Sequence, residues 1–323
     1  MMTELSKADM PIDRRFDIVA LGEPMIEFNE TSPGQFRQGF GGDTANFAVA
    51  AVRQGARVAY WTRVGADGFG RKLLDLWKEE GIDTSAVQID ADAPTGVYFV
   101  THGEAGHAFE YLRAGSAASR MHSGSLPLEL IGASQFLHVS GICQAISNSA
   151  CDTVFAAIDA AHAAGTRVSY DPNLRLRLWP LTRARAVIEA TIGLIDLFLP
   201  SLDEALTLAE VDSREAVFRW AAHCGARQVV LKCGADGAWI WQHDDRVARH
   251  VPGIVVKPVD TTGAGDCFDG ALVMRLVAGD TLEHAARYAN VAAALSTSGY
   301  GAVAPIPNRA AVLIHLAKEL LLK

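Results

Sequence analysis

The chain has 323 residues, of which 50% are hydrophobic and 20% are charged, a composition typical of a compact soluble protein. Its formal net charge of −8 and the absence of any long basic run argue against nucleic acid as a partner. No apolar run approaches the roughly 20 residues that a membrane helix needs, so no membrane association is expected.

Cysteine and histidine usage predicts a reducing compartment and no structural zinc. The five cysteines are odd in number and form no Cys-x-x-Cys pair, which is typical of free thiols in a cytoplasmic protein. The ten histidines show neither His-Glu-x-x-His nor a mixed Cys/His ligand spacing. We therefore expect a cytoplasmic protein whose thiols are reduced.

Short apolar segments alternate with helical segments in chain order. Strands are predicted at residues 16–21, 58–64, 136–140, 168–170, 197–199 and 229–231. Helices are predicted at residues 44–54, 69–80 and 151–164, each followed at once by a glycine. Further helices are predicted at residues 264–278, 282–298 and 309–321. Strands that alternate with helices predict an α/β protein whose mostly parallel sheet is covered on both faces.

Two segments, residues 23–40 and 87–112, break this alternation. They contain short stretches of alternating polarity, such as residues 97–100 and 109–112, and no helical pattern. We expect them to pair antiparallel and to form a small, partly covered sheet attached to the α/β body.

The strongest local signal is the segment 260–266, Asp-Thr-Thr-Gly-Ala-Gly-Asp, which opens a predicted helix. Small residues at a helix start leave backbone N–H groups unpaired, and together with the helix dipole these groups suit an anion such as a phosphate. A carboxylate in that first turn, Asp266, can accept a proton from an attacking hydroxyl. On local physics alone, a glycine turn followed by an acidic residue explains the segment equally well.

Two familiar nucleotide-binding motifs are absent from the sequence. No Gly-x-x-x-x-Gly-Lys-Ser/Thr segment occurs, which excludes a P-loop enzyme. No Gly-x-Gly-x-x-Gly follows the first predicted strand, which argues against a nicotinamide dehydrogenase.

Three further segments place polar residues beside glycines or at strand ends. In residues 39–46 the paired glycines permit close approach of a ligand, and Asp43 and Asn46 lie one helical turn apart, although plain N-capping by Asp43 needs no ligand. Arg175 follows a predicted strand, where it can pair with a carboxylate or phosphate or be an ordinary surface arginine. Residues 230–238 read as strand, glycine turn and strand, which suits either a nucleotide contact or a hairpin.

Taken together and in this order, these segments resemble the ribokinase-like (PfkB) family of carbohydrate kinases. The paired glycines near the N-terminus and the segment 260–266 are similar to the two signatures of that family. The resemblance implies a three-layer α/β fold with a mostly parallel central sheet and a small β-sheet lid. It also implies a single kinase domain over residues 16–307, with lid segments at about 23–40 and 87–112, and a C-terminal helix at 308–323 packed on the same domain.

The resemblance also implies roles for individual residues. Asp266 would be the catalytic base, with backbone N–H groups of Gly263, Ala264 and Gly265 around the transferred phosphoryl group. Acceptor contacts are expected from Gly42, Asp43, Asn46, Tyr98, Tyr111, Arg113 and Arg175. Nucleotide contacts are expected from Asn173, Ser201, Lys232, Gly234, Gly237 and Asn290. Glu204 would act on Mg²⁺ through water, although Ser201 stands where the family's Asn-x-x-Glu motif has asparagine.

Within the family, the sequence most resembles the 2-keto-3-deoxygluconate kinases. Residues 39–46, the aromatic-then-Arg segment 109–113 and the Asp-x-Asn-x-Arg-x-x-Leu-Trp pattern of residues 171–179 carry this likeness. A 2-keto acid has a carboxylate, and Arg113 and Arg175 would supply the positive charge that an acidic protein needs to bind it. We therefore expect phosphorylation of 2-keto-3-deoxygluconate at its terminal hydroxyl, to give the 6-phosphate. A fructokinase or another sugar kinase of the family is one alternative, and a non-catalytic sugar- or nucleotide-binding regulator is another.

The expected cofactors are ATP and Mg²⁺, with a monovalent cation left open. The expected partners are a small sugar acid and ATP. The apolar face of the lid further predicts a homo-oligomer, a dimer or higher, that associates through this small sheet.

Overall fold

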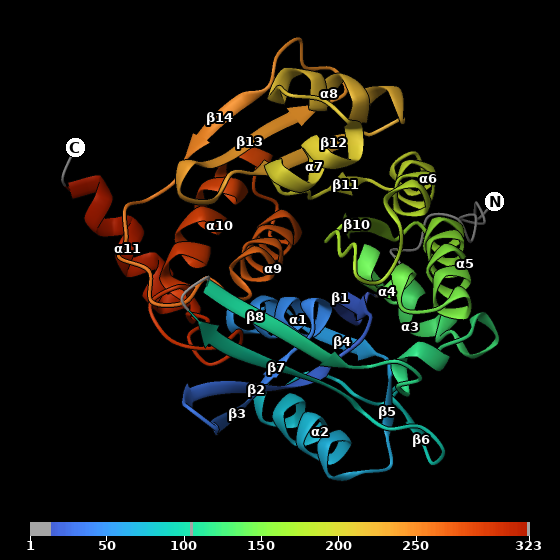
Figure 1. The fold of residues 1–323 in the computed structure, drawn as a ribbon. Helices are drawn as coiled ribbons and strands as arrows, with labels where there is room; N and C mark the ends of the chain where they lie inside the picture. The colour runs from blue at the N-terminus through green and yellow to red at the C-terminus, as the bar shows by residue number, and fades with distance from the viewer. Residues whose placement is uncertain (1–13, 104–105, 322–323) are drawn as a thin grey trace, which may run out of the picture.

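The structure, a computed structural model, describes residues 14–103 and 106–321. Its centre is an eight-stranded sheet in the order β14-β13-β12-β11-β10-β9-β1-β4 (Figure 1). The strands are β1 (Phe16–Leu21), β4 (Val58–Trp61), β9 (Ser134–Ser140), β10 (Arg167–Asp171), β11 (Leu197–Phe198), β12 (Gln228–Lys232), β13 (Gly237–Gln242) and β14 (Arg249–Pro252). From β4 to β12 all neighbours are parallel, and β13 pairs antiparallel with both β12 and β14. The predicted α/β fold with a mostly parallel sheet is confirmed.

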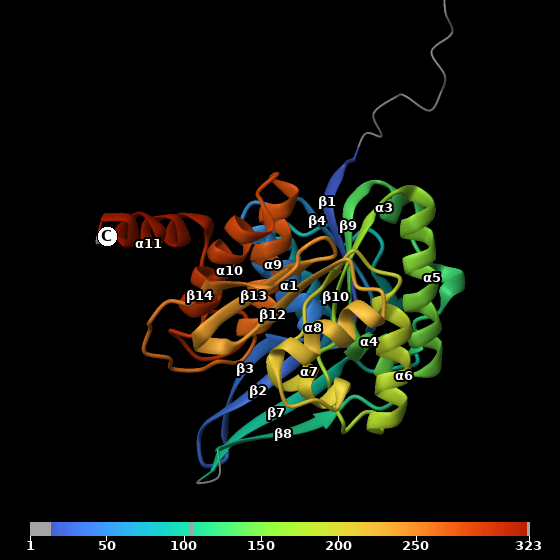
Figure 2. The ribbon, with the colours of Figure 1, turned by 90° about the horizontal axis from the view of Figure 1, so that it is seen from above.

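Helices cover both faces of this sheet (Figure 2). One face carries α1 (Asp43–Arg53), α9 (Ala264–Val277), α10 (Leu282–Ser296) and, packed on α10, α11 (Arg309–Leu321). The other carries α3 (Leu128–Gly132), α4 (Gly141–Ala145), α5 (Asn148–Ala164), α6 (Leu181–Ile192), α7 (Leu202–Ala209) and α8 (Arg214–His223). Because side chains alternate along a strand, Ile18 and Ala20 of β1 enter the first core while Val19 and Leu21 enter the second. Both faces of β1 are therefore buried, which explains its unbroken apolar run.

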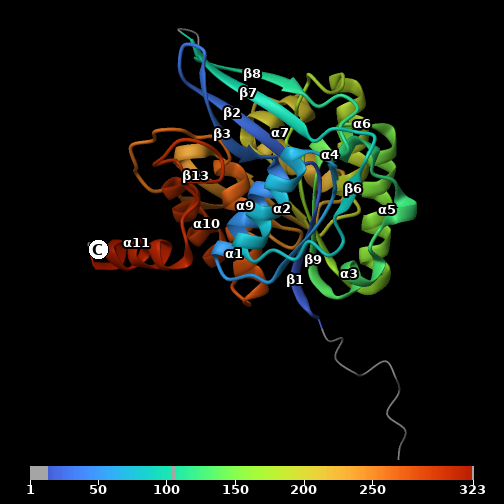
Figure 3. The same ribbon diagram turned by 90° about the horizontal axis from the view of Figure 1, so that it is seen from below.

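A separate four-stranded sheet is formed by β2 (Met25–Ser32), β3 (Gln35–Gly41), β7 (Gly96–Gly103) and β8 (Gly106–Leu112), in the order β3-β2-β7-β8 (Figure 3). The expectation of a small sheet from these segments is confirmed, but its strands are not all antiparallel, because β2 and β7 pair in parallel. The chain between them contains α1, β4 and α2 (Gly68–Glu80), and this long connection lets β7 return in the direction of β2.

The predicted strand 58–64 is also corrected, because it is two strands in two sheets. The chain leaves the main sheet after β4, and β5 (Arg63–Gly65) pairs instead with β6 (Gln88–Asp90). Two contacts fix this exit: the Thr62 hydroxyl donates to the carbonyl oxygen of Gly22 at 2.7 Å, and Arg63 forms an ion pair with Asp90 at 2.8 Å. Residues 88–90 consequently lie outside the small sheet.

Within the described ranges, no helix combines the length and the apolar character that a membrane crossing requires.

The crossing of α1 over α9 is the tightest helix contact near the carboxyl ends of the strands. A Cβ at Gly270 of α9 would lie 2.6 Å from the carbonyl oxygen of Phe47 and 2.8 Å from the Cβ of Ala50, both on α1. Only glycine fits at this distance, so Gly270 sets how closely the N-terminal turns of α1 and α9 approach one another.

We expect Gly270→Ala to lower the free energy of unfolding by about 1–3 kcal/mol, since the added methyl group must push the two helices apart. Chemical denaturation measures this change. Gly132→Ala in α3 is the matched control, because its Cβ would meet nothing closer than 3.5 Å. A Gly270→Ala protein as stable as the control would contradict the assigned contact.

Candidate active site

A cavity of ≈ 1390 Å³ lies between the small sheet and the carboxyl ends of the parallel strands. Its wall combines β7 and β8 of the small sheet with the ends of β10 and β12 and the N-terminus of α9. Every residue for which the sequence predicts a site role lines this one cavity: Gly42, Asp43, Asn46, Tyr98, Tyr111, Arg113, Asn173, Arg175, Ser201, Glu204, Lys232, Gly234, Gly237, Gly263, Ala264, Gly265, Asp266 and Asn290. The predicted residues are thus brought together, while their individual roles stay predictions.

The N-terminus of α9 points its backbone into the cavity. Gly263 precedes the helix with φ of 75°, a left-handed conformation that glycine adopts without strain. The first helical hydrogen bond is donated by the N–H of Cys267 to the carbonyl oxygen of Gly263, so the N–H groups of Gly265 and Asp266 are not needed by the helix. The N–H of Ala264, one of the predicted phosphate donors, is already directed at the carbonyl oxygen of Thr261, at 3.2 Å. The turn therefore offers an anion site made mainly by the residues after Ala264.

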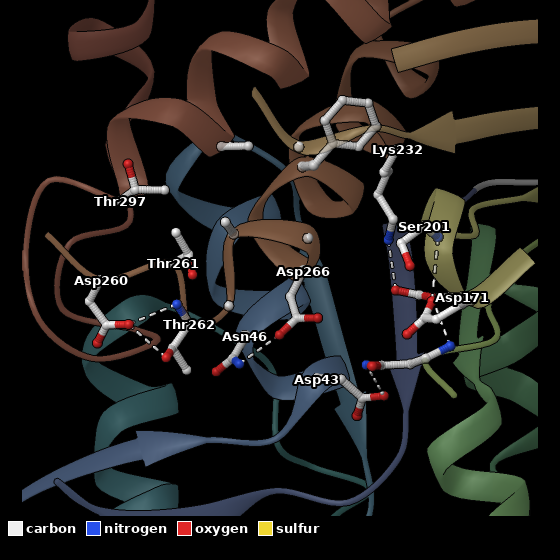
Figure 4. A pocket seen from close by; sticks show the side chains of 18 of the residues that line it. Asp43, Asn46, Asp171, Ser201, Lys232, Asp260, Thr261, Thr262, Asp266 and Thr297 are labelled. Carbon is white, nitrogen blue, oxygen red and sulfur yellow. Dashed lines mark hydrogen bonds and ion pairs between the residues drawn. The ribbon is translucent and has the colours of Figure 1, made fainter. Parts of the chain in front are cut away.

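The loop before this turn is fixed by Asp260. One carboxylate oxygen accepts hydrogen bonds from the N–H and the hydroxyl of Thr262, at 2.9 and 2.7 Å (Figure 4). The other accepts from the N–H of Gly301 at 2.9 Å. Asp260 thus holds the glycine turn against the segment that follows α10.

Asp266 lies in the first turn of α9, with its carboxylate held by Asn46 of α1. The amide nitrogen Nδ2 of Asn46 donates to Oδ2 of Asp266 at 2.8 Å (Figure 4). Burial in the cavity wall raises the pKa of Asp266 to about 8, and the nearby carboxylates of Asp43 and Asp171 act in the same direction. A carboxylate with a pKa in this range, placed beside an anion site, has the properties of a general base.

Asp43 and Asn173 form a hydrogen-bonded pair beside this base. Asp43 is the first residue of α1 after the N-cap Gly42, and its Oδ1 accepts from the N–H of Thr44 at 2.8 Å. Its Oδ2 accepts from the amide of Asn173 at 3.1 Å. Asn173 has φ of 35°, and its own N–H donates to Asp171 at 2.9 Å. The Asn173 amide is therefore engaged with Asp43, a predicted acceptor residue, and its predicted contact with the nucleotide stays a prediction.

Both predicted acceptor arginines have carboxylate partners that the sequence analysis did not assign to them. Arg113 forms a buried ion pair with Glu23, which also accepts from the hydroxyl of Ser116 at 2.7 Å. Arg175 lies 3.3 Å from Glu204, and its side chain is 45% exposed while that of Glu204 is 19% exposed. Neither arginine contributes an uncompensated positive charge to the cavity.

The Arg113 side chain nevertheless has a donor left over. Its Nε is buried, and no residue in the described parts of the chain accepts a hydrogen bond from it. The guanidinium lies 5.5 Å from the centre of the Tyr111 ring and lines the cavity. A buried donor without an acceptor is costly, but this nitrogen is shielded from the cavity, so a ligand would meet other atoms of the Arg113 side chain.

On the side of the small sheet, Tyr98 donates its hydroxyl proton to Glu27 at 2.6 Å. Both side chains are buried. Burial raises the pKa of Glu27, and the carboxylate of Asp260 acts in the same direction. Glu27 therefore stabilises the position of Tyr98 in the cavity wall.

Three of the residues predicted to contact the nucleotide, Gly234, Gly237 and Asn290, lie near β13 and β14. Gly234 and Gly237, with φ of 58° and 93°, form the turn between β12 and β13. The predicted hairpin at residues 230–238 is thus present, and it also lines the cavity. Asn290 uses its amide to bind the carbonyl oxygens of Val251 and Pro252 at 3.0 and 3.1 Å, which ties α10 to β14.

Glu204 fits an outer contact to a metal ion rather than a complete binding site. Across the described ranges, no group of three or more His, Cys, Asp or Glu side chains is arranged to hold a metal. The Glu204 carboxylate lines the cavity and is contacted by Arg175 and, at 3.4 Å, by the N–H of Ser201. Mg²⁺ bound to a nucleotide keeps several waters and needs only one or two carboxylates, and Glu204 meets this requirement.

Sequence reasoning missed four acidic residues of the site: Glu23, Glu27, Asp171 and Asp269. A signal for Glu23 and Asp171 was present, because both stand at the carboxyl end of a buried parallel strand. For Asp269 the signal was its spacing of three residues from Asp266, which places both acids on one face of α9.

Comparisons with known proteins agree with this geometry. A family profile described as "pfkB family carbohydrate kinase" matches residues 15–309. The 2-dehydro-3-deoxygluconokinase of Thermoproteus tenax is 32% identical over 322 residues, covering 96% of this chain and 97% of that protein. The probable fructokinase-7 of Arabidopsis thaliana is 33% identical over 314 residues, covering 91% of each. A solved structure of the fructokinase from Vibrio cholerae O395, in its fructose-, ADP- and calcium-bound form, is 31% identical with a TM-score of 0.83, covering 92% of this chain and 98% of that one.

The raised pKa of Asp266 predicts how its replacement changes stability. A carboxyl group whose pKa is higher in the folded than in the unfolded state loses stability as the pH rises between the two values. The pKa of Asp266 rises from 3.8 to about 8 on folding, so the wild type loses stability progressively between about pH 4 and pH 8. Asp266→Asn removes the titration, and at about 1.4 kcal/mol per pKa unit we expect its free energy of unfolding to exceed that of wild type by several kcal/mol at pH 8 and to equal it at pH 4.

Urea denaturation at the two pH values measures the difference. Asp159→Asn, which changes an exposed aspartate of α5, is the control and should match wild type at both. An Asp266→Asn protein with the same stability difference at pH 4 and pH 8 would show that Asp266 does not titrate as the structure indicates.

Proposed function

The chain belongs to the pfkB family of carbohydrate kinases, and we propose that its acceptor is 2-keto-3-deoxygluconate, phosphorylated at the terminal hydroxyl with ATP and Mg²⁺. The product would be 2-keto-3-deoxy-6-phosphogluconate. The relative from Thermoproteus tenax supports this acceptor, and fructokinases at similar identity support a neutral sugar. The choice between a sugar acid and a neutral sugar therefore depends on the residues of the cavity.

The observation that carries the choice of a sugar acid is the presence of two arginines, Arg113 and Arg175, in the wall of one cavity. A carboxylate is the strongest acceptor for a guanidinium N–H, with a charge-assisted hydrogen bond worth about 1.5–3 kcal/mol. The Arg175 side chain is 45% exposed, so it can turn from Glu204 toward a ligand without losing its solvation.

A fructokinase activity is the second candidate, and one observation favours it. Glu23 neutralises Arg113 and Glu204 neutralises Arg175, so the cavity has no net positive charge at these positions. Carboxylates such as Asp43 accept hydrogen bonds from neutral hydroxyl groups. A sugar with only hydroxyl groups would find partners here without an ionic contact.

The residues around Asp266 account for the chemistry with either acceptor. Asp266 accepts the proton of the attacking hydroxyl as its oxygen bonds to the γ-phosphorus and the bond to the ADP oxygen breaks. Asn46 keeps the carboxylate directed into the cavity. The N–H groups at the start of α9 donate to the oxygens of the transferred phosphoryl group. Glu204 would hold a water of the Mg²⁺ ion, which supplies positive charge to the phosphate oxygens.

We further propose that the small sheet acts as a lid. Tyr98 and Tyr111 of this sheet line the cavity, and Arg177 of the body donates to the carbonyl oxygen of Phe109 on β8 at 2.6 Å. Closure of such a sheet keeps water from the γ-phosphate. Phe36, which is 40% exposed, supplies part of an apolar surface on the small sheet, and the association of two copies through it stays a prediction that light scattering tests.

We expect Asp266→Asn to lower kcat by about 10²-fold or more while ATP still binds, because an amide cannot accept the proton. In the wild type, kcat/KM for the acceptor should rise with pH up to about 8, as Asp266 ionises, and this rise should be absent in the variant. A coupled ADP-release assay between pH 6 and pH 9 measures both. Full turnover in Asp266→Asn would contradict the assignment of the base.

Arg175→Ala tests the acceptor. We expect the ratio of kcat/KM for 2-keto-3-deoxygluconate to that for fructose to fall by about 10-fold or more, since one charge-assisted contact is lost only with the acid. Arg175→Ala also leaves Glu204 without its ion-pair partner, and this effect should change kcat/KM for both acceptors alike. Fructose is therefore the internal control. Arg183→Ala is the control variant, because Arg183 is exposed and bonds to Asn148.

A wild-type enzyme that prefers fructose would refute the proposed acceptor. An unchanged ratio in Arg175→Ala would refute only the part given to Arg175.

A further inference from the structure

A buried ion cluster joins three elements next to the cavity, and only part of it has a role in the proposed function. The ammonium group of Lys232, at the end of β12, donates to Oδ2 of Asp171 and to Oδ2 of Asp269, each at 2.8 Å. Asp171 ends β10, and Asp269 lies in α9. The side chains are 11%, 7% and 1% exposed, respectively, so water contributes little to their solvation.

Asp269 is the deepest of the three and does not line the cavity. It lies one helical turn after Asp266, on the same face of α9. It cannot therefore touch a substrate directly. Any effect on the reaction must pass through Lys232 or Asp171, which do line the cavity.

The cluster is neutral when Asp269 holds a proton. Oδ1 of Asp269 is buried and receives no hydrogen bond from the described parts of the chain, while Asp269 and Asp171 contact each other through their carboxyl groups. Burial raises the pKa of Asp269 well above its usual value, and the carboxylate of Asp171 adds to this. Burial also acts to raise the pKa of Asp171, but Lys232 and the hydrogen bond from Asp269 outweigh it, so this pKa is lowered. The raised pKa favours a protonated Asp269, whose Oδ2 accepts a hydrogen bond from Lys232.

Lys232 is held at the anion site as a result. Its ammonium nitrogen lies 3.6 Å from the position that a Cβ on Gly265 would occupy. Gly265 is in the turn whose N–H groups face the cavity. An ammonium group has three donors, and the two carboxyl groups use two of them. The third is available to a phosphate oxygen in the cavity.

We propose that Asp269 is a positioning residue for phosphoryl transfer, which fixes the ammonium group of Lys232 beside Gly265 for contact with a nucleotide phosphate. This inference rests on the proposed use of ATP. A lysine side chain has many rotamers, and holding it in one of them before the nucleotide arrives removes an entropic cost from binding. Asp171 alone gives one hydrogen bond and leaves the ammonium group free to rotate about it.

The test is a series of ligands that differ only in phosphate: adenosine, ADP and AMP-PNP, bound to wild type and to Asp269→Ala. Isothermal titration calorimetry with Mg²⁺ present measures each affinity. We expect adenosine to bind both proteins equally, while ADP and AMP-PNP bind Asp269→Ala about 10-fold more weakly. A variant that is misfolded would bind adenosine more weakly as well. The ligand series therefore distinguishes positioning of Lys232 from a general structural role of Asp269.

Asp269→Asn is the conservative variant, because its amide is uncharged and its oxygen can still accept from Lys232. It should bind all three ligands within about 2-fold of wild type, and a loss as large as in Asp269→Ala would overturn the neutral state assigned to Asp269. Asp280→Asn is the matched control, since it breaks an ion pair of the same helix, with Arg275 at 2.7 Å, far along α9 from the cavity. If Asp269→Ala does not fold, Asp269→Ser replaces it, because its hydroxyl is too short to bridge both partners.

Equal affinity of Asp269→Ala and wild type for AMP-PNP would overturn the proposal, and so would an equal loss of all three ligands. Neither result bears on the kinase assignment itself, which fails only if the wild type neither binds these nucleotides nor phosphorylates any sugar.

Discussion

The gathering of acidic side chains around the N-terminus of α9 is the constraint on which the site depends. Asp43, Asp171 and Asp266 line one cavity, and Asp269 lies directly behind it. Carboxylates this close cannot all be ionised away from water without strong repulsion. The structure meets this constraint in two ways: burial raises the pKa values of Asp266 and Asp269, and Lys232 is buried as the counter-ion. The pKa of the base Asp266 therefore depends on the charged groups around it as well as on its own position.

The fold brings these groups together because parallel strands present all their carboxyl ends at one edge. Asp171 and Lys232 come from β10 and β12, while the helix that follows the last strands supplies Asp266 and Asp269. The close crossing at Gly270 then places Asn46 of α1 within hydrogen-bonding distance of Asp266. One methyl group added at Gly270 would therefore also disturb the Asn46–Asp266 hydrogen bond, which orients the base.

Much of this could be predicted from the sequence where the signal is local. The strand at 16–21 and the helices that end at Gly55, Gly81 and Gly165 follow from apolar runs and glycine stops, and the structure confirms them. The parallel pairing of β2 with β7 was missed, because it depends on the path of the chain between them. At the site, Arg113 was found from its motif, but its partner Glu23 stands 90 residues earlier, and no spacing rule connects the two. Residue type and motif indicate which groups take part, while charge pairing depends on the folded chain.

The two arginine pairs differ in a way that bears on the acceptor. The Arg113–Glu23 pair is buried, so breaking it would leave a charge without a partner, and Arg113 keeps its place. In the Arg175–Glu204 pair, 3.3 Å apart, Arg175 is 45% exposed, so its guanidinium can leave the carboxylate and stay solvated. On the proposed function, a sugar carboxylate would take Arg175 from Glu204, and the metal would then meet a carboxylate that has lost its cation. The acceptor would draw Arg175 away from Glu204, and the metal would draw Glu204 away from Arg175. Binding of the acceptor would therefore strengthen the metal contact instead of competing with it.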